Sequence, residues 1–418
     1  MGLVYKQLFS KNIFICKMDV FHDAVEIESK KVYQIQALYN NDSTLEFVIQ
    51  PDSDYILPNG VFLNFAVNID GHYIMDNQAD KLFDSVDVIL NNEKVTNRSN
   101  TNEYFLSSFF QTKANYPGGH FTNVLGPEGW WNARNYNANE IVASKMVDDM
   151  TETQVIKNNV VESRLYHYSM QIHSPLFQQL KPLPSGVSIQ INFKRSKAVI
   201  PVLKVVSEAD STYDTEQIKL MDPYLEVTSI KSERLNRKLN LNTKSVLEYP
   251  IQMGVIRTHT IDDGINHVKF NCTTGGKLPT RIYTGLLDPL AYQGHVAKCA
   301  TSFRRYGCKS IELFVDNKPL PGSKVKVASN NYVNAYTQFL HQCKFLSNNF
   351  CGTPLTLNEY TQTNFITAYD MTEVDLENGW LSVELDFDEI TDAKILLVVY
   401  MVFDKCITFD KYRSVTME

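Results

Sequence analysis

Histidine side chains could supply metal ligands or a general base, but their spacing in this chain favours neither use. A metal centre built on the pattern H-x-H needs a second histidine two residues after the first, whereas Tyr168 and Ser169 follow His167. His167 and His173 lie in one strand-like run. We therefore interpret both as sheet histidines with local hydrogen bonds.

The common catalytic and nucleotide-binding patterns G-x-S-x-G, H-E-x-x-H, G-x-G-x-x-G and the P-loop do not occur in the sequence. Gly275–Lys277 resembles the end of a P-loop, but Asn271 stands where the first glycine of that loop is required. Asp262-Asp263 is followed by Gly264, which is typical of a turn rather than of two catalytic carboxylates. These patterns predict a non-enzymatic protein with no catalytic residues, no cofactor and no metal.

Composition narrows the function classes further. The net charge of −7 disfavours a protein that grips phosphate backbones, so we expect no sequence-specific nucleic-acid binding. The seven cysteines form no C-x-x-C pair, and we predict that they are reduced, mostly buried and of intracellular origin. No run approaches eighteen uninterrupted apolar residues, which predicts that the chain has no transmembrane segment.

The elements that would position any site are mainly strands. Ser188–Phe193 and Ser382–Phe387 alternate apolar and polar residues, the pattern of an antiparallel sheet with one face in the core. Tyrosine and phenylalanine are abundant, at 22 and 23 residues, and suit pleated, half-buried surfaces. Short helices are expected over 102–112 and 332–343, where aromatic residues and leucine recur at three- and four-residue steps, with further turns of helix over 174–180 and 288–299.

A repeat of domain size organises these elements. In the first half, Val86–Leu90 is followed by Asn91-Asn92, an aromatic helix and then Ser188–Phe193; in the second half, the same order begins with Ile311–Val315 and Asp316-Asn317. The repeat predicts an all-β protein of two tandem jelly-roll sandwich or barrel domains with short embedded helices. We assign 1–30 to an N-terminal arm, 31–240 to the first jelly roll with a long loop over 115–160, and 241–418 to the second.

Trp130 and Trp131 lie in a long segment rich in glycine, asparagine and proline. Long loops in compact domains often carry function, and exposed tryptophan favours contact surfaces. Trp130 and Trp131 are therefore our candidate assembly or contact residues, with packing of the loop on its own domain as the alternative.

Several motifs carry a family resemblance. Leu82–Val88, Leu278–Asp288 and Tyr369–Thr372 follow one another in an order that resembles the major capsid proteins of Polinton/Maverick elements and the related adintoviruses. The resemblance runs from about residue 30 to the end, but segment 117–147 has no match in it.

This resemblance implies a double jelly-roll subunit of a virion capsid that is assembled inside the host cell. Three copies would form a homotrimer, a pseudo-hexameric capsomer that packs against neighbouring capsomers and a minor capsid (penton) protein in an icosahedral shell around double-stranded DNA. The rival interpretations are a carbohydrate-binding β-sandwich module whose Trp130 and Trp131 stack on sugars, a metalloenzyme of the cupin type, and a host-domesticated capsid relative.

Overall fold

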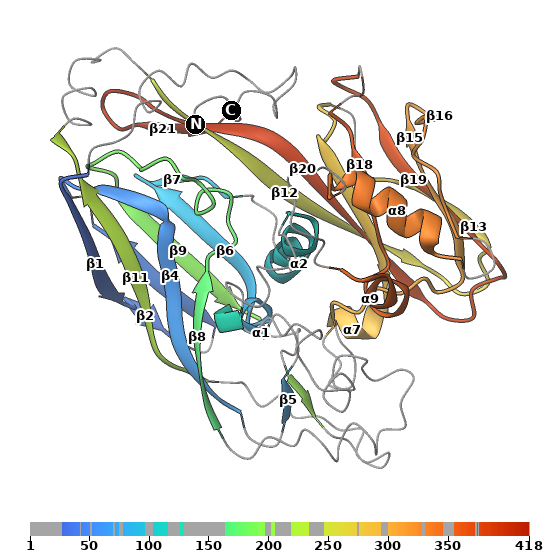
Figure 1. Cartoon of the computed structure of the whole chain (residues 1–418), viewed down its shortest axis with the longest axis horizontal. Helices are drawn as coiled ribbons and strands as arrows, with labels where there is room; N and C mark the ends of the chain where they lie inside the picture. Colours follow the sequence, from blue (N-terminus) through green and yellow to red (C-terminus); the bar gives the residue numbers. More distant parts are fainter. Residues whose placement is uncertain are drawn as a thin grey trace.

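Antiparallel sheets dominate the molecule (Figure 1). The computed structural model describes residues 27–41, 43–50, 52–69, 72–74, 78–96, 103–115, 126–128, 164–196, 202–204, 219–233, 246–273, 276–293, 300–327, 331–345, 355–372, 374 and 376–417. Within this part, the chain forms two tandem jelly rolls with short helices, and the predicted all-β fold class is confirmed.

The first jelly roll packs two sheets face to face around a core of aliphatic and aromatic side chains. One sheet has the order β1 (Ser29–Gln36), β11 (Leu220–Lys231), β4 (Tyr55–Ile69), β8 (Arg164–Gln171). The other has the order β2 (Tyr39–Asn40), β3 (Thr44–Ile49), β9 (Ile189–Arg195), β6 (Phe83–Leu90), β7 (Glu93–Lys94). A separate ribbon joins β5 (His72–Ile74) to β10 (Val202–Lys204).

Eight strands of the second jelly roll follow the same order in its two sheets as eight strands of the first. One sheet has the order β12 (Leu247–Ile261), β20 (Ile395–Phe409), β14 (Arg281–Leu287), β18 (Ile366–Asp370), with β21 (Val415–Met417) also on β20. The other has the order β13 (His267–Asn271), β19 (Leu381–Phe387), β15 (Cys308–Val315), β16 (Lys318–Pro319), with β17 (Val325–Lys326) also on β15. Thus β15 takes the place of β6, and β19 takes that of β9, as the sequence repeat requires.

The matching turns have a shared physical cause. Asn91 and Asn92 both have positive φ, at 46° and 71°, and so do Asp316 and Asn317, at 50° and 63°. Two left-handed residues in succession form the type I′ turn whose twist suits a two-residue hairpin, and asparagine and aspartate tolerate that region. The same hairpin therefore joins β6 to β7 and β15 to β16.

The two main expected helices are present with slightly different bounds. They are α2 (Glu103–Asn115) and α8 (Val333–Gln342), beside the shorter α1 (Gln78–Lys81), α7 (Pro289–Gln293), α9 (Leu357–Gln362) and the 3-10 helix η1 (Gly126–Glu128). Helix α9 begins with a capping box, in which the Thr356 side chain and that of Glu359 each accept from the other's backbone N–H. The described helices include none with the length and apolar character needed to cross a membrane.

Candidate functional site

The structure does not test the contact residues chosen from the sequence. Trp130 and Trp131 lie outside the described residues, as does most of the 115–160 segment. What the described residues do bring together is the junction between the two jelly rolls and, beside it, a buried group of charged side chains.

Helix α2 connects the two cores. It follows β7 of the first jelly roll, and its Tyr104 packs in the first core. Its next turns place Phe105, Leu106, Phe109 and Phe110 in the core of the second jelly roll. These side chains recur at three- and four-residue steps, so they share one face of the helix. Figure 1 shows α2 between the sheets of the first jelly roll and the long strands β12 and β20.

Phe110 is the centre of this contact. Its ring is stacked on that of Tyr400 of β20, with centroids 5.5 Å apart and planes 11° apart, and lies 5.2 Å from the ring of Phe303. Small residues make room for these rings: a Cβ on Gly254 would lie 2.2 Å from Tyr400 Cε2, and one on Gly285 would lie 2.4 Å from Phe303 Cδ1. Both glycines are therefore required by close packing.

A polar chain runs from the surface into the same junction. The Gln178 side-chain amide donates to Gln111 Oε1 at 2.7 Å, and Gln111 Nε2 donates to the Tyr400 hydroxyl at 2.9 Å. Burial raises the pKa of Tyr400 against the effect of its hydrogen bonds to Ser107 and Gln111, so the hydroxyl keeps its proton. Because Gln178 follows β8 and Tyr400 lies in β20, this chain fixes α2 to both jelly rolls.

Strands β12 and β20 also belong to both cores. They pair without interruption from Leu247↔Phe409 to Ile261↔Ile395. In β12, Leu247, Tyr249, Ile251 and Met253 pack in the first core, whereas Ile256 packs in the second. Ile261 also packs in the second core, so the two ends of this 15-residue strand serve different cores. The Tyr249 hydroxyl also donates to the backbone oxygen of Pro182 at 2.6 Å.

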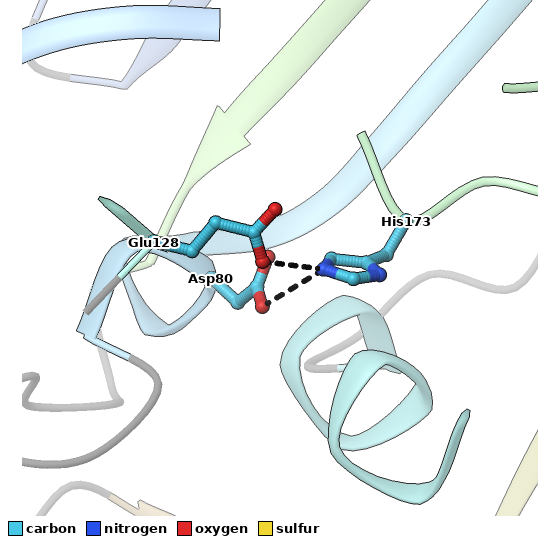
Figure 2. A group of neighbouring side chains, drawn as sticks. All are labelled: Asp80, Glu128 and His173. Carbon is cyan, nitrogen blue, oxygen red and sulfur yellow. Dashed lines mark hydrogen bonds and ion pairs between the residues drawn. The ribbon is translucent and has the colours of Figure 1, made fainter. Parts of the chain in front are cut away.

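A group of charged side chains lies buried in the first jelly roll next to α2. Figure 2 shows Asp80 of α1, Glu128 of η1 and His173, which follows the end of β8, pointing toward one another. His173 Nε2 is 3.0 Å from Glu128 Oε2 and 3.7 Å from Asp80 Oδ2. The Gln171 backbone N–H donates to Glu128 Oε1, and the Ser108 hydroxyl donates to Asp80 Oδ2.

The interpretation of His173 as an ordinary sheet histidine is wrong. It lies beyond the end of β8 with 0% of its side chain exposed, while His167, within β8, is exposed. The two residues differ because the strand ends between them, so their even spacing no longer places them on one face. No local spacing could have revealed the cluster, since its members come from three segments that are distant in the sequence.

Burial and mutual charge shift the proton affinities of this cluster. Burial raises the pKa of Asp80, and the positive charge of His173 only partly opposes it. For His173, burial lowers the pKa, but Asp80 and Glu128 raise it more, and it rises to about 9. Burial and the charge of Asp80 raise the pKa of Tyr104 well above its usual value, so its hydroxyl stays neutral while it accepts from the His173 backbone N–H. The arrangement can hold a positive charge, as a proton or as a cation.

Comparisons with known proteins bear on the fold. No protein-family model matches the sequence. The uncharacterized protein F54H12.2 of Caenorhabditis elegans is 24% identical over 181 residues, which are 40% of this chain and 43% of that protein, so less than half of the relative's length is matched.

Solved viral structures match nearly the whole chain. A chain of the Sputnik virophage gives a TM-score of 0.63 at 11% identity, over 99% of this chain and 91% of that one. The PBCV-1 virus capsid gives 0.57 at 10% identity, over 95% and 98%. The mavirus major capsid protein gives 0.53 at 8% identity, over 98% and 95%. At these identities the likeness establishes a shared fold over nearly the whole chain.

Proposed function

We propose that this chain is a viral-type major capsid protein, a structural subunit of a virion shell. The observation that carries the proposal is the end-to-end likeness of both jelly rolls to chains of viral capsids, including the mavirus major capsid protein. A likeness confined to one jelly roll would not distinguish a capsid protein from a binding module, since a single jelly roll hosts many functions. A match across two fused jelly rolls is far more restrictive.

The interlocked junction supports an assembly role. Helix α2 and the β12–β20 ribbon tie the two jelly rolls together through buried aromatic and polar contacts. The angle between them is therefore fixed before assembly. A subunit with this rigidity presents its side faces at constant geometry, which a closed symmetric assembly requires.

Three such subunits provide six jelly rolls, and we propose that they form a homotrimeric, pseudo-hexameric capsomer. In the proposed shell, capsomers contact neighbouring capsomers and a minor capsid (penton) protein, and together they enclose double-stranded DNA in an icosahedral particle assembled inside the host cell. The motifs Leu82–Val88 and Leu278–Asp288 support placing the chain near the capsid proteins of Polinton/Maverick elements and adintoviruses. The net charge of −7 supports a shell that leaves neutralisation of DNA to other partners.

The mass of the purified protein in solution tests this proposal first. By size exclusion with light scattering, a trimer of the 47.8 kDa chain should give about 143 kDa, and negative stain should show a hexagonal outline. A clean monomer at all concentrations would argue against the capsomer. Saturable binding on a glycan array would then favour the carbohydrate-binding alternative.

Trp130 and Trp131 remain our proposed contact residues. The double change Trp130→Ala, Trp131→Ala should reduce trimers or shells while leaving the unfolding temperature of the subunit within a few degrees. Trp380→Ala removes the remaining indole of the chain, at a side chain that is 56% exposed on the second jelly roll, and serves as the control. Equal loss of assembly in both variants would argue against a specific role for the pair.

A further inference from the structure

We propose that Asp80, Glu128 and His173 form a binding site for a divalent transition-metal cation, with Zn²⁺ as the best match, which fastens residues 126–128 to the first jelly roll. The inference goes beyond the capsid proposal and does not depend on it: a protein that forms trimers could lack the metal, and a monomer could bind it.

The donor set has suitable chemistry and spacing. Zn²⁺ takes imidazole nitrogen and carboxylate oxygen as ligands, and two ligands at about 2.1 Å in a tetrahedral site lie about 3.4 Å apart. His173 Nε2 lies 3.0 Å and 3.7 Å from the facing oxygens of Glu128 and Asp80, which bracket that separation. The three donor atoms all lie within 4.8 Å of one another. An ion can therefore reach all three with small side-chain movements.

The charge balance favours a dication over a proton. Two carboxylates and one imidazolium leave a net negative charge among side chains that are at most 3% exposed, and an uncompensated buried charge is costly. Two carboxylates, a neutral imidazole and a dication sum to zero. Among the described residues, Asp80 Oδ1 is buried and has no hydrogen-bond partner, so this carboxylate has ligand capacity to spare.

The surrounding hydrogen bonds orient the donors. The Gln171 backbone N–H holds Glu128 Oε1 at 2.7 Å, which leaves Oε2 directed at His173. The Ser108 hydroxyl of α2 fixes the Asp80 carboxylate, and the Tyr104 hydroxyl accepts from the His173 backbone N–H at 3.1 Å. Partners of this kind fix the geometry of carboxylate ligands around protein-bound metals, whereas His173 Nδ1 is buried without a hydrogen-bond partner among the described residues. Here they also connect the site to the helix that joins the two jelly rolls.

The test uses the full chain, refolded from urea with and without Zn²⁺ because the donors are buried. Metal analysis after desalting should find one Zn²⁺ per chain. His173→Asn and Glu128→Gln should each weaken binding at least about 100-fold. His167→Asn removes an exposed histidine from the neighbouring strand and should bind like the parent. Zinc should also slow amide exchange in the peptide that contains Glu128.

Substoichiometric zinc in the parent protein, or equal zinc in the parent and both site variants, would overturn the proposal and leave a proton-bridged ion triad in its place. If the variants fail to fold, the Co²⁺-loaded parent decides. Visible absorption of a low-coordinate nitrogen and oxygen site supports the proposal. A thiolate-to-cobalt band, or a purely octahedral spectrum, places the metal elsewhere and overturns it.

Discussion

Removal of the Phe110 ring is the most direct test of the interlocked junction. Phe110 belongs to a helix that follows the strands of the first jelly roll, yet its fully buried side chain lies among Tyr283, Phe303 and Tyr400 of the second. Truncation of a buried phenylalanine to alanine costs about 3–5 kcal/mol, through lost burial and the cavity left behind. The stacked contact with Tyr400 favours the upper end of this range, because ordered aromatic pairs add about 0.5–1.5 kcal/mol.

The decisive measurement compares how much Phe110→Ala lowers the stability of each jelly roll. If the junction makes the two jelly rolls one cooperative unit, the free energy of opening measured by amide hydrogen exchange should fall by the same amount in β9 and in β19. Phe47→Ala is the matched control: Phe47 is equally buried but lies in the first core, with its ring 6.2 Å from that of Phe193. It should affect both strands in the same way.

Two outcomes would refute this reasoning. Loss of protection in β19 alone for Phe110→Ala, and in β9 alone for Phe47→Ala, would mean that the jelly rolls unfold independently. A cost for Phe110→Ala below about 1 kcal/mol would mean that the aromatic contact contributes little, since even modest core truncations usually exceed that value.

Three further predictions follow from the packing, the acid–base contacts and the turns. Gly254→Ala should lower the thermal unfolding temperature by displacing the Tyr400 ring, since overpacking costs about 1–3 kcal/mol; an unchanged melting curve would contradict the close approach. Burial raises the pKa of Asp370, but its bonds to Lys344 and Thr372 lower it more, so its contribution to stability is present above pH 3.8 and is lost as pH falls through the lowered pKa. In Asp370→Asn, the urea midpoint should therefore fall less steeply than in the parent protein as the solution is acidified. An equally steep fall in both proteins would exclude Asp370 as the origin of the acid sensitivity. Asn317→Gly should raise the urea midpoint, because glycine adopts the observed φ of 63° without a Cβ penalty, whereas a lower midpoint would contradict the turn assignment.

The junction also explains how one chain can serve as an assembly unit. A flexible pair of jelly rolls would lose entropy of relative motion whenever a capsomer formed, and affinity would fall accordingly. The shared ribbon of β12 and β20 removes this cost within the folded subunit. The proposed metal site acts at a different point, where it would hold residues 126–128 against the first jelly roll.

The sequence by itself determined the strands, the repeat and the turns. Alternation in Ser188–Phe193 and Ser382–Phe387 predicted β9 and β19, and Asn91-Asn92 and Asp316-Asn317 are turn signals that the structure places in the two hairpins. These features depend on neighbours within a few residues, so local propensity and periodicity are sufficient to reveal them.

Only the tertiary structure decided which core each element serves. The pattern of α2 reveals an apolar face, but not that Phe110 contacts Tyr400 across the junction. The same is true of Asp80, Glu128 and His173, which no short pattern connects. Periodicity encodes which side of an element is buried, whereas the identity of the partner depends on long-range packing, and a charged cluster forms only where packing brings distant segments together and excludes water.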